Sequence, residues 1–309
     1  IISLPISISS GYEEEVINGG EVRSQGVEAI LSAVPVYRNN FTWRTQANFS
    51  RNVTTVESLP DNAGRITLAY SSVYDNPNQA VYYQVEEGGR VGDMYGTGYL
   101  KNGNNEFIIN SNGQYIVNND LILLGNYNPD FIIGWNNELN YKNWNANFLF
   151  DWRQGGVLVS RTQALAGVAG QLEETGYRPE SGIVADGVIN VGTEENPVWE
   201  KNTTAINPET YYRQYYDRNH EENNTYDASY IKLRQLAFGY TFNNLKGSFL
   251  SDDVKLSVSL IGRNLFAISE IPHFDPEQLA VQGNQFVSGV EDMSYATTRS
   301  YGIKISLNF

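Results

Sequence analysis

The sequence predicts an all-β protein, an antiparallel transmembrane β-barrel with long extracellular loops and short periplasmic turns. The first observation is that apolar and polar residues alternate along many segments, which places every second side chain on one face of a strand. The second is that the connections between these segments are alternately short and long, as in outer-membrane barrels. Aromatic residues near the short turns are the third observation, because their rings favour the membrane interface.

Alternation predicts eight strands along the chain. The final segment is the clearest, with Tyr301, Ile303, Ile305 and Leu307 separated by polar or small residues. Between residues 230 and 242 the phase of the alternation slips at Arg234, which indicates a β-bulge. One amphipathic helix is a candidate, at residues 161–175. The expected strands are near residues 2–9, 20–34, 41–50, 131–141, 144–152, 230–242, 254–266 and 301–309.

The connections set the orientation of the barrel. A compact domain rarely contains structureless loops longer than about 15 residues, so the long connections need a reason. If the chain ends in the periplasm, every short connection lies there and every long one lies outside. The short connections are residues 35–40, 142–143 and 243–252, and the long ones are residues 10–19, 58–129, 154–227 and 267–297.

A soluble β-sandwich is the main alternative, because it also has one apolar and one polar face per strand. The aromatic residues at the ends of the expected strands favour the barrel, since they gather beside the short turns. They are Phe41, Trp43, Tyr141, Trp144, Tyr240, Phe242 and Phe309.

Composition excludes several other classes. The chain has 309 residues and a net charge of -14, with 41% hydrophobic and 13% aromatic residues. That aromatic content argues against disorder, and the absence of Cys excludes disulfides and thiol chemistry. The acidic balance argues against a nucleic-acid partner. The first residues lack the pattern of a signal peptide and resemble the middle of a strand, so we expect a mature chain, a fragment or part of something longer.

Residues for catalysis or for a metal site have little support, so we expect no enzyme, no cofactor and no metal. His220 and His273 each lie alone in a loop. The acidic runs at residues 13–15 and 221–222 are interpreted as solvated loop charges, because nothing holds them at a defined separation. Calcium in the loops is possible, but no ligand spacing supports it.

Binding residues are better supported, in one tyrosine-rich loop segment. Aromatic faces stack on sugar rings or peptides, and Arg adds directed donors. Two interpretations stay open: the rings form small cores between loops, or they form a surface for a substrate or a partner. The segment comprises Tyr211, Tyr212, Arg213, Tyr215, Tyr216 and Arg218.

Four stretches in order carry a resemblance to a known family. They are VINGGEVRSQGVE at residues 16–28, LGNYNPDF at 124–131, DASYIKLR at 227–234, and IGRNLF at 261–266 followed by FDPE at 274–277. In these stretches the chain resembles the SusC/RagA-type TonB-linked outer-membrane proteins of Bacteroidota. It departs from them at residues 110–116, which lack the carboxylates of a calcium-like run, and at residues 295–300, which lack two prolines.

The resemblance implies that residues 1–309 are the C-terminal portion of a barrel of about twenty-two strands, with the plug domain and N-terminal strands absent from this chain. It implies an outer-membrane, TonB-dependent importer of oligosaccharides or peptides that works with a SusD-like lipoprotein lid. TonB would act through the absent N-terminal parts. The barrel-assembly machinery would recognise the last strand, through Tyr301, Ile303, Ile305, Leu307 and Phe309. The rival hypotheses are a soluble secreted carbohydrate-binding module and a surface barrel without transport.

Overall fold

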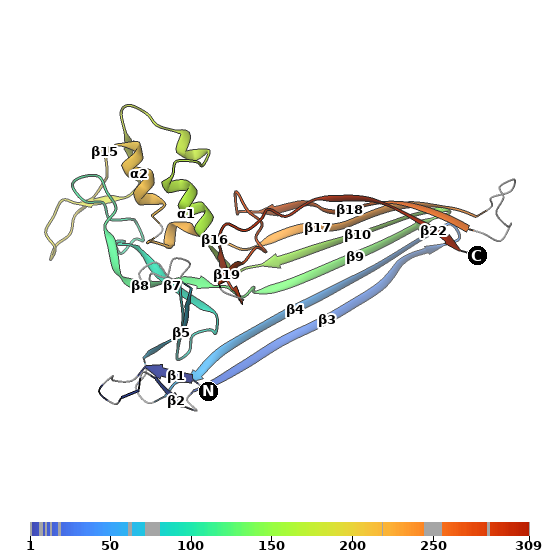
Figure 1. The fold of residues 1–309 in the computed structure, drawn as a ribbon, viewed down its shortest axis with the longest axis horizontal. Helices are drawn as coiled ribbons and strands as arrows, with labels where there is room; N and C mark the ends of the chain where they lie inside the picture. Colours follow the sequence, from blue (N-terminus) through green and yellow to red (C-terminus); the bar gives the residue numbers. More distant parts are fainter. Residues whose placement is uncertain are drawn as a thin grey trace.

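A long antiparallel sheet of seven strands dominates the computed structural model, in the order β22-β18-β17-β10-β9-β4-β3. Figure 1 shows these strands side by side as one curved layer. The structure describes residues 2–5, 9, 11–12, 14–17, 20–60, 64–71, 81–217, 219–243, 255–282 and 285–308. The strands are β3 (Glu21–Arg38), β4 (Phe41–Ser58), β9 (Phe131–Tyr141), β10 (Trp144–Gln154), β17 (Tyr230–Phe242), β18 (Lys255–Ser269) and β22 (Ser300–Asn308).

Tight turns and bulges set the register of this sheet. The turn at residues 142–143 is confirmed, and Lys142 has a φ of 52° there. The expected turn at residues 35–40 is wrong in extent, because β3 continues to Arg38. A bulge between Ala33 and Val36 places Pro35, which has no N–H, inside the strand. The predicted bulge at Arg234 is confirmed, since Leu149 pairs with Gln235 and the next pair skips Arg234.

The first expected strand does not join this sheet. Residues Ile2–Pro5 form β1, which pairs with β2 (Glu14–Ile17) as a separate two-stranded sheet. Seven strands therefore form the sheet in the described part of the chain, where the sequence predicted eight. Alternation near residues 2–9 is weak, so it carries little information on which partner the segment takes.

One face of the sheet is apolar and exposed. Trp135 is 41% exposed, Leu260 59% and Ile303 68%, although all three belong to the apolar side of the alternation. Aromatic rings contact each other from strand to strand on this face, for example Trp135 with Phe150 and Phe150 with Phe266. A soluble sandwich would bury these side chains between two sheets, whereas the wall of a transmembrane barrel turns them to lipid. Across the described residues, no helix is both long and apolar enough to pass through a membrane.

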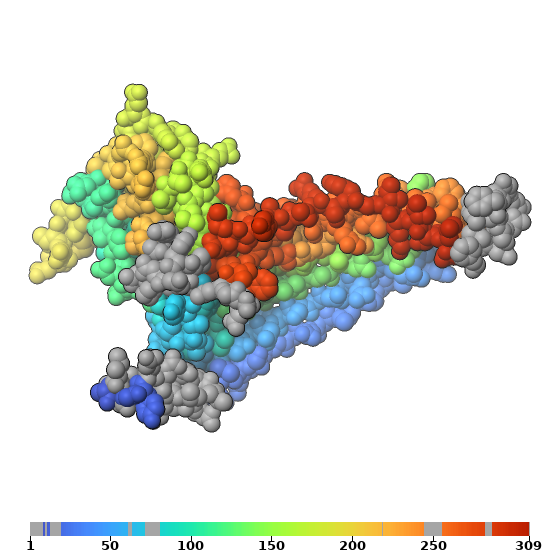
Figure 2. Space-filling view, in the orientation of Figure 1, coloured from blue at the N-terminus to red at the C-terminus, as the bar shows by residue number. Residues whose placement is uncertain are grey.

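Three of the long connections, 58–129, 154–227 and 267–297, fold together into a head at one end of the sheet (Figures 1 and 2). The connection 58–129 contains a four-stranded sheet in the order β5-β6-β7-β8. Its strands are β5 (Arg65–Ser71), β6 (Val81–Glu86), β7 (Asp93–Tyr99) and β8 (Val117–Asn126).

The connection 154–227 contains two short helices. The amphipathic helix expected at residues 161–175 is only partly confirmed, because α1 (Arg161–Val168) ends at Val168 and has no distinct apolar face. A second helix, α2 (Pro208–Tyr215), was not expected. Its start signal is the pair Asn207-Pro208, in which Asn207 accepts a hydrogen bond from the backbone N–H of Glu209. Around the helices lie β11 (Val157–Ser160), η3 (Glu174–Gly176), β12 (Ile183–Val184), β13 (Val188–Asn190), β14 (Trp199–Lys201), β15 (Ala205–Ile206), η4 (Glu222–Asn224) and β16 (Thr225–Asp227).

The connection 267–297 completes the head with β19 (Ala280–Gln282), β20 (Gln285–Val287) and β21 (Val290–Glu291). The three connections share one hydrophobic core, because Val81 and Met94 pack with Val159 and with Val290. β21 also pairs in parallel with β11. Each of these three connections is therefore held in place by contacts with the other two. Those contacts offset the conformational entropy that a connection loses when it becomes ordered.

Candidate functional site

The tyrosine-rich segment lies on α2 and its C-terminal end, and most of its rings are packed inside the head. Tyr211 and Tyr215 stack on each other with their ring centroids 5.8 Å apart, and both pack against the cluster of Tyr99, Ile109 and Tyr115. This arrangement agrees with the interpretation that the rings form small cores between loops. A substrate-facing or partner-facing role for the segment stays a prediction.

Tyr212 and Tyr216 are the most buried members of this segment. The Tyr212 hydroxyl donates to the carbonyl oxygens of Glu174 and Tyr177, at 2.7 and 2.9 Å. The Tyr216 hydroxyl donates to the Glu174 carboxylate at 3.0 Å, and burial raises the pKa of Tyr216. Neither ring face is free to stack on a ligand in this arrangement.

The exposed member is Arg213, which forms an ion pair with Glu209 one turn away at 2.9 Å. Arg213 and Tyr212 line a hollow of 560 Å³ between the ends of α1 and α2, together with Arg178. Arg218 lies outside the described residues.

The acidic pair at residues 221–222 corrects the interpretation of a solvated charge run. Glu221 is buried, and its carboxylate accepts hydrogen bonds from the backbone N–H and the hydroxyl of Thr97, both at 3.2 Å. Glu222 accepts from the backbone N–H of Tyr99 at 3.0 Å and pairs with Lys101 at 2.5 Å. The two carboxylates therefore accept hydrogen bonds from Thr97 and Tyr99 of β7, and Glu222 also pairs with Lys101. These contacts hold η4 against β7.

Two glycines of β7 make room for these carboxylates. A Cβ on Gly98 would lie 2.5 Å from Glu222 Oε2 and 2.6 Å from Ile122 Cδ1. A Cβ on Gly96 would lie 3.1 Å from Glu221 Cβ. The Gly96-Thr97-Gly98 sequence, which has no phosphate-loop setting, therefore has a packing role.

We expect Gly98→Val to displace η4 and to destabilise the head by about 1–3 kcal/mol, the usual cost of overpacking. Hydrogen exchange of residues 219–227 in the complete purified protein measures this as faster exchange. Gly103→Val is the matched control, because nothing lies within 4 Å of a Cβ at that position. Equal exchange in the two variants would contradict the packing role.

Histidine and metal chemistry find no further support. His220 contacts Thr97 Oγ1 through Nδ1 at 3.3 Å, and burial lowers the pKa of its imidazole. His273 Nε2 lies 3.7 Å from the Glu174 carboxylate. In residues 110–116, the Asn110 side-chain oxygen accepts from the backbone N–H groups of Asn112 and Gln114, as an ordinary turn does. In the part of the chain that the structure describes, three or more acidic or histidine side chains do not gather in a way that could hold a metal.

An ion-pair network joins the last long connection to the sheet, and sequence reasoning did not find it. Lys232 of β17 pairs with Asp275, and with Glu277 at 2.6 Å. Arg234 pairs with Glu277 and with Asp151 of β10. The Tyr230 hydroxyl donates to Glu277 at 2.8 Å. The network holds the segment 274–277 against β10 and β17.

The network holds Glu277 in its charged form. Burial opposes the charge on Glu277, but hydrogen bonds from Arg234, Lys232 and Tyr230 outweigh it and hold the pKa of that carboxyl at about 2. Lys232 is almost wholly buried and sits between two carboxylates. Glu277 therefore carries its charge at neutral pH, where it accepts hydrogen bonds from Arg234, Lys232 and Tyr230.

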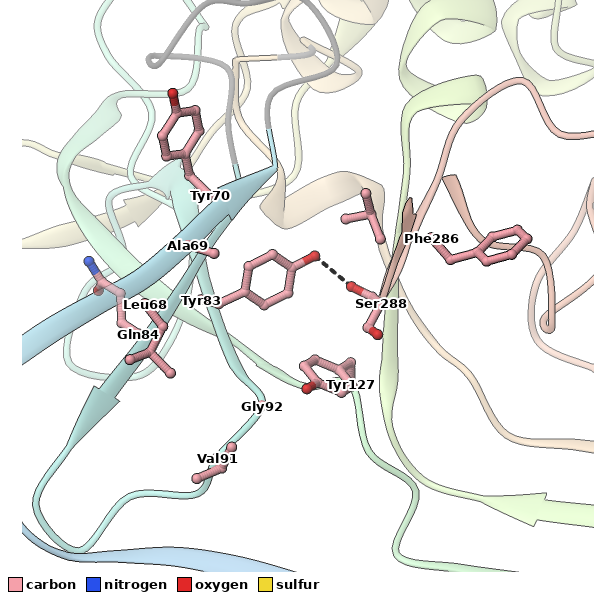
Figure 3. A pocket seen from close by; sticks show the side chains of 11 residues that line it. Leu68, Ala69, Tyr70, Tyr83, Gln84, Val91, Gly92, Tyr127, Phe286 and Ser288 are labelled. Atoms are coloured by element: carbon pink, nitrogen blue, oxygen red, sulfur yellow. Dashed lines mark hydrogen bonds between the residues drawn. The ribbon is translucent and has the colours of Figure 1, made fainter. Parts of the chain in front are cut away.

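A neutral hollow of 520 Å³ lies between β5, β6 and residues 286–288. Figure 3 shows Tyr83 at its centre, with the hydroxyl donating to the carbonyl oxygen of Ser288 at 2.6 Å. Tyr127, from the LGNYNPDF stretch, meets Tyr83 edge to face with ring centroids 6.0 Å apart.

The last strand carries the proposed assembly signal. β22 pairs with β18 on one edge, and no other strand pairs with it in the described residues. Tyr301, Ile303, Ile305 and Leu307 are all exposed, while Phe309 lies outside the described residues. The recognition of this strand by an assembly machinery stays a prediction.

The single apolar-faced sheet, its short turns and its folded loop head together define part of the wall of a large transmembrane β-barrel. The resemblance to the TonB-linked receptors is confirmed by similar proteins. The chain is 28% identical over 333 residues to TonB-dependent receptor P3 of Formosa agariphila, a match that covers 99% of this chain and 30% of that receptor. It is 23% identical over 349 residues to TonB-dependent receptor P39 of the same organism, covering 100% and 32%. The chain thus spans under a third of the length of these curated relatives.

Solved structures share the fold. The RagAB peptide importer in its open-open state matches with a TM-score of 0.64 and 17% identity, over 100% of this chain and 31% of that one. Its closed-closed state matches with a TM-score of 0.62 and 16% identity, over 99% and 32%. No protein-family model matches the chain.

Proposed function

We propose that this chain forms part of the wall and the outer loops of an outer-membrane, TonB-dependent importer of bulky nutrients, either oligosaccharides or peptides. The observation that carries the proposal is the exposed apolar face across the sheet, ending at a folded loop head. The similarity to TonB-dependent receptors supports the coupling to TonB. RagAB, whose fold this chain shares, is a peptide importer, and this suggests a peptide cargo here.

The mechanism assigns no chemistry on the cargo to this chain. A plug moved by the TonB complex would open the barrel, and the residues of this chain would form the wall beside it. A SusD-like lipoprotein would cover the loop head as a lid. The segment 1–309 would then be the C-terminal portion of the barrel, with the plug and the remaining strands supplied by other parts of the protein.

Fractionation and uptake test the proposal together. We expect the complete protein to sediment with the outer membrane, to need detergent for extraction and to migrate differently on gels before and after heating. We also expect cargo uptake to be lost without TonB, and the lid lipoprotein to co-purify. Extraction without detergent would support the soluble carbohydrate-binding module instead. If the protein lies in the outer membrane but deletion of its gene leaves cargo uptake unchanged, the result would support a surface barrel without transport.

Removal of Phe309 gives a second test. The last strand has an open edge and pairs by strand addition, so its terminal aromatic residue is expected to guide capture by the barrel-assembly machinery. We expect deletion of Phe309 to lower the outer-membrane yield about tenfold. This is the effect expected when a binding interface loses one anchoring side chain. Phe309→Tyr keeps the ring and serves as the control. Equal yields for all three proteins would contradict the assembly role.

A further inference from the structure

The pairing of β4 is interrupted near the head end of the sheet. On the side of β9, the pairing extends as far as Ser50, which lies opposite Ile132. A few residues further, the carbonyl oxygen of Thr54 accepts a hydrogen bond from the backbone N–H of Val91 at 2.9 Å. In the described part of the chain, residues 51–53 have no strand partner on this side. A hollow of 340 Å³ lies at this interruption, and residues from both sides of the interruption line it.

Only two residues that line this hollow carry a charge, and both are arginines. Arg51 belongs to β4, and Arg90 belongs to the turn between β6 and β7. Arg51 is exposed, and none of the ion pairs among the described residues includes it. Arg90 lies 3.6 Å from Asp130, but that carboxylate is 59% exposed, so the pair contributes little. The arginine hollow is therefore locally positive in a chain whose net charge is -14.

The arginine hollow lies where the apolar face of the sheet ends. Arg51 follows Phe49 by two residues and so points to the same face of β4. Phe49 lies opposite Ile133, and its ring centroid is 5.9 Å from that of Phe131, which also lines the hollow. Phe41, at the short-turn end of β4, precedes Arg51 by ten residues. A transmembrane strand takes about 9–11 residues, so Arg51 lies at the head-side surface of the membrane.

We propose that the arginine hollow binds the phosphate of a membrane lipid, with the acyl chains of that lipid against the aromatic row below it. Guanidinium groups bind phosphate through two parallel hydrogen bonds, and lipid phosphates lie at this surface of the membrane. The row continues from Phe49 and Phe131 to Trp152, whose ring centroid is 5.1 Å from that of Phe131. A lipid supplies both an anion for the arginines and apolar chains for the rings. The site goes beyond the importer function and does not depend on the cargo.

The charge of the arginine hollow has a matched control on the same face of the sheet. Arg38 of β3 lies opposite Phe41 and is exposed like Arg51, but it lies at the other surface of the membrane. The probe is dioleoylphosphatidic acid, titrated into the complete purified protein in detergent. Native mass spectrometry gives the dissociation constant of the first bound lipid.

We expect Arg51→Gln and Arg90→Gln each to raise this dissociation constant about tenfold, the effect of losing a hydrogen bond to a charged group. Arg38→Gln should leave it unchanged, since that position has neither the hollow nor a second arginine beside it. Equal dissociation constants for Arg51→Gln and Arg38→Gln would overturn the proposal.

Two competitors identify the part of the lipid that is bound. Glycerol 3-phosphate carries the phosphate without acyl chains, and dioleoylglycerol carries the chains without the phosphate. We expect neither to displace phosphatidic acid at an equal concentration. Displacement by glycerol 3-phosphate would show a site for free phosphate, and displacement by dioleoylglycerol would show that the arginines are not used. If Arg51→Gln instead lowers co-purification of the lid lipoprotein and leaves lipid binding intact, the hollow contacts an acidic protein and the proposal fails.

Discussion

Lys232→Met should release the segment 274–277 from the sheet and destabilise it by about 3 kcal/mol, because two carboxylates would lose their buried cation. The Lys232 side chain is 4% exposed and pairs with both Asp275 and Glu277. Met keeps the length of the side chain and removes its charge. Hydrogen exchange of residues 271–279 in the complete protein measures the effect as a lower free energy of local opening.

The matched control for this variant is Arg44→Met. Arg44 pairs with Glu138 at 3.6 Å, but both side chains are well exposed, so the pair contributes about 0–1 kcal/mol. Similar effects of Lys232→Met and Arg44→Met on the segment 274–277 would show that the network does not hold it.

The same network predicts a dependence on pH. The pKa of Glu277 is about 2 in the folded protein, below its ordinary value of 4.5. A carboxyl with a depressed pKa stabilises the fold fully above its unfolded pKa and loses that contribution as the pH falls through the folded value. The segment should therefore keep constant protection from neutral pH to about 4.5 and lose it between about 4.5 and 2. Glu277→Gln should remove this acid-dependent loss.

The strands were predictable from the sequence because their two faces differ in chemistry. Phe148, Phe150 and Trp152 alternate with polar or inward residues, and a membrane wall keeps that contrast along the whole strand. The bulge at Arg234 was visible for the same reason, since one extra residue changes the phase. The weak alternation near residues 2–9 predicted a strand of the barrel wall, whereas the strand found there, β1, pairs with β2 instead.

The loop head was less predictable because long-range contacts determine it. Glu221 looks like a solvated acid in the sequence, but it is buried against Thr97, a residue 124 positions away. Lys232, Arg234 and Glu277 lie in two separate stretches of the family resemblance, and nothing in either stretch indicates that they pair. The face of a strand on which a residue lies follows from the local alternation of the sequence. Which loop residues form ion pairs depends on how the whole chain folds.

The buried pair of Arg161 and Glu221 gives the second large expected effect. Arg161 begins α1 and Glu221 precedes η4, and the two side chains are 1% and 2% exposed. Their closest nitrogen and oxygen are 3.6 Å apart. Burial raises the pKa of Glu221, and the nearby guanidinium of Arg161 opposes that rise. The carboxylate therefore depends on Arg161 for much of its compensation inside the head.

Arg161→Ala should destabilise the loop head by about 3–5 kcal/mol, because it leaves a buried acid without its cation and opens a void where the side chain was. Glu221→Gln should cost less, since the amide is neutral and its oxygen can still accept from Thr97. The double variant should then be more stable than the sum of the two single changes predicts, which a double-mutant cycle on thermal unfolding of the head measures. Arg213→Ala is the control, because its pair with Glu209 is exposed and its loss should change stability by less than about 0.5 kcal/mol. Additive single effects would mean that Arg161 and Glu221 do not interact.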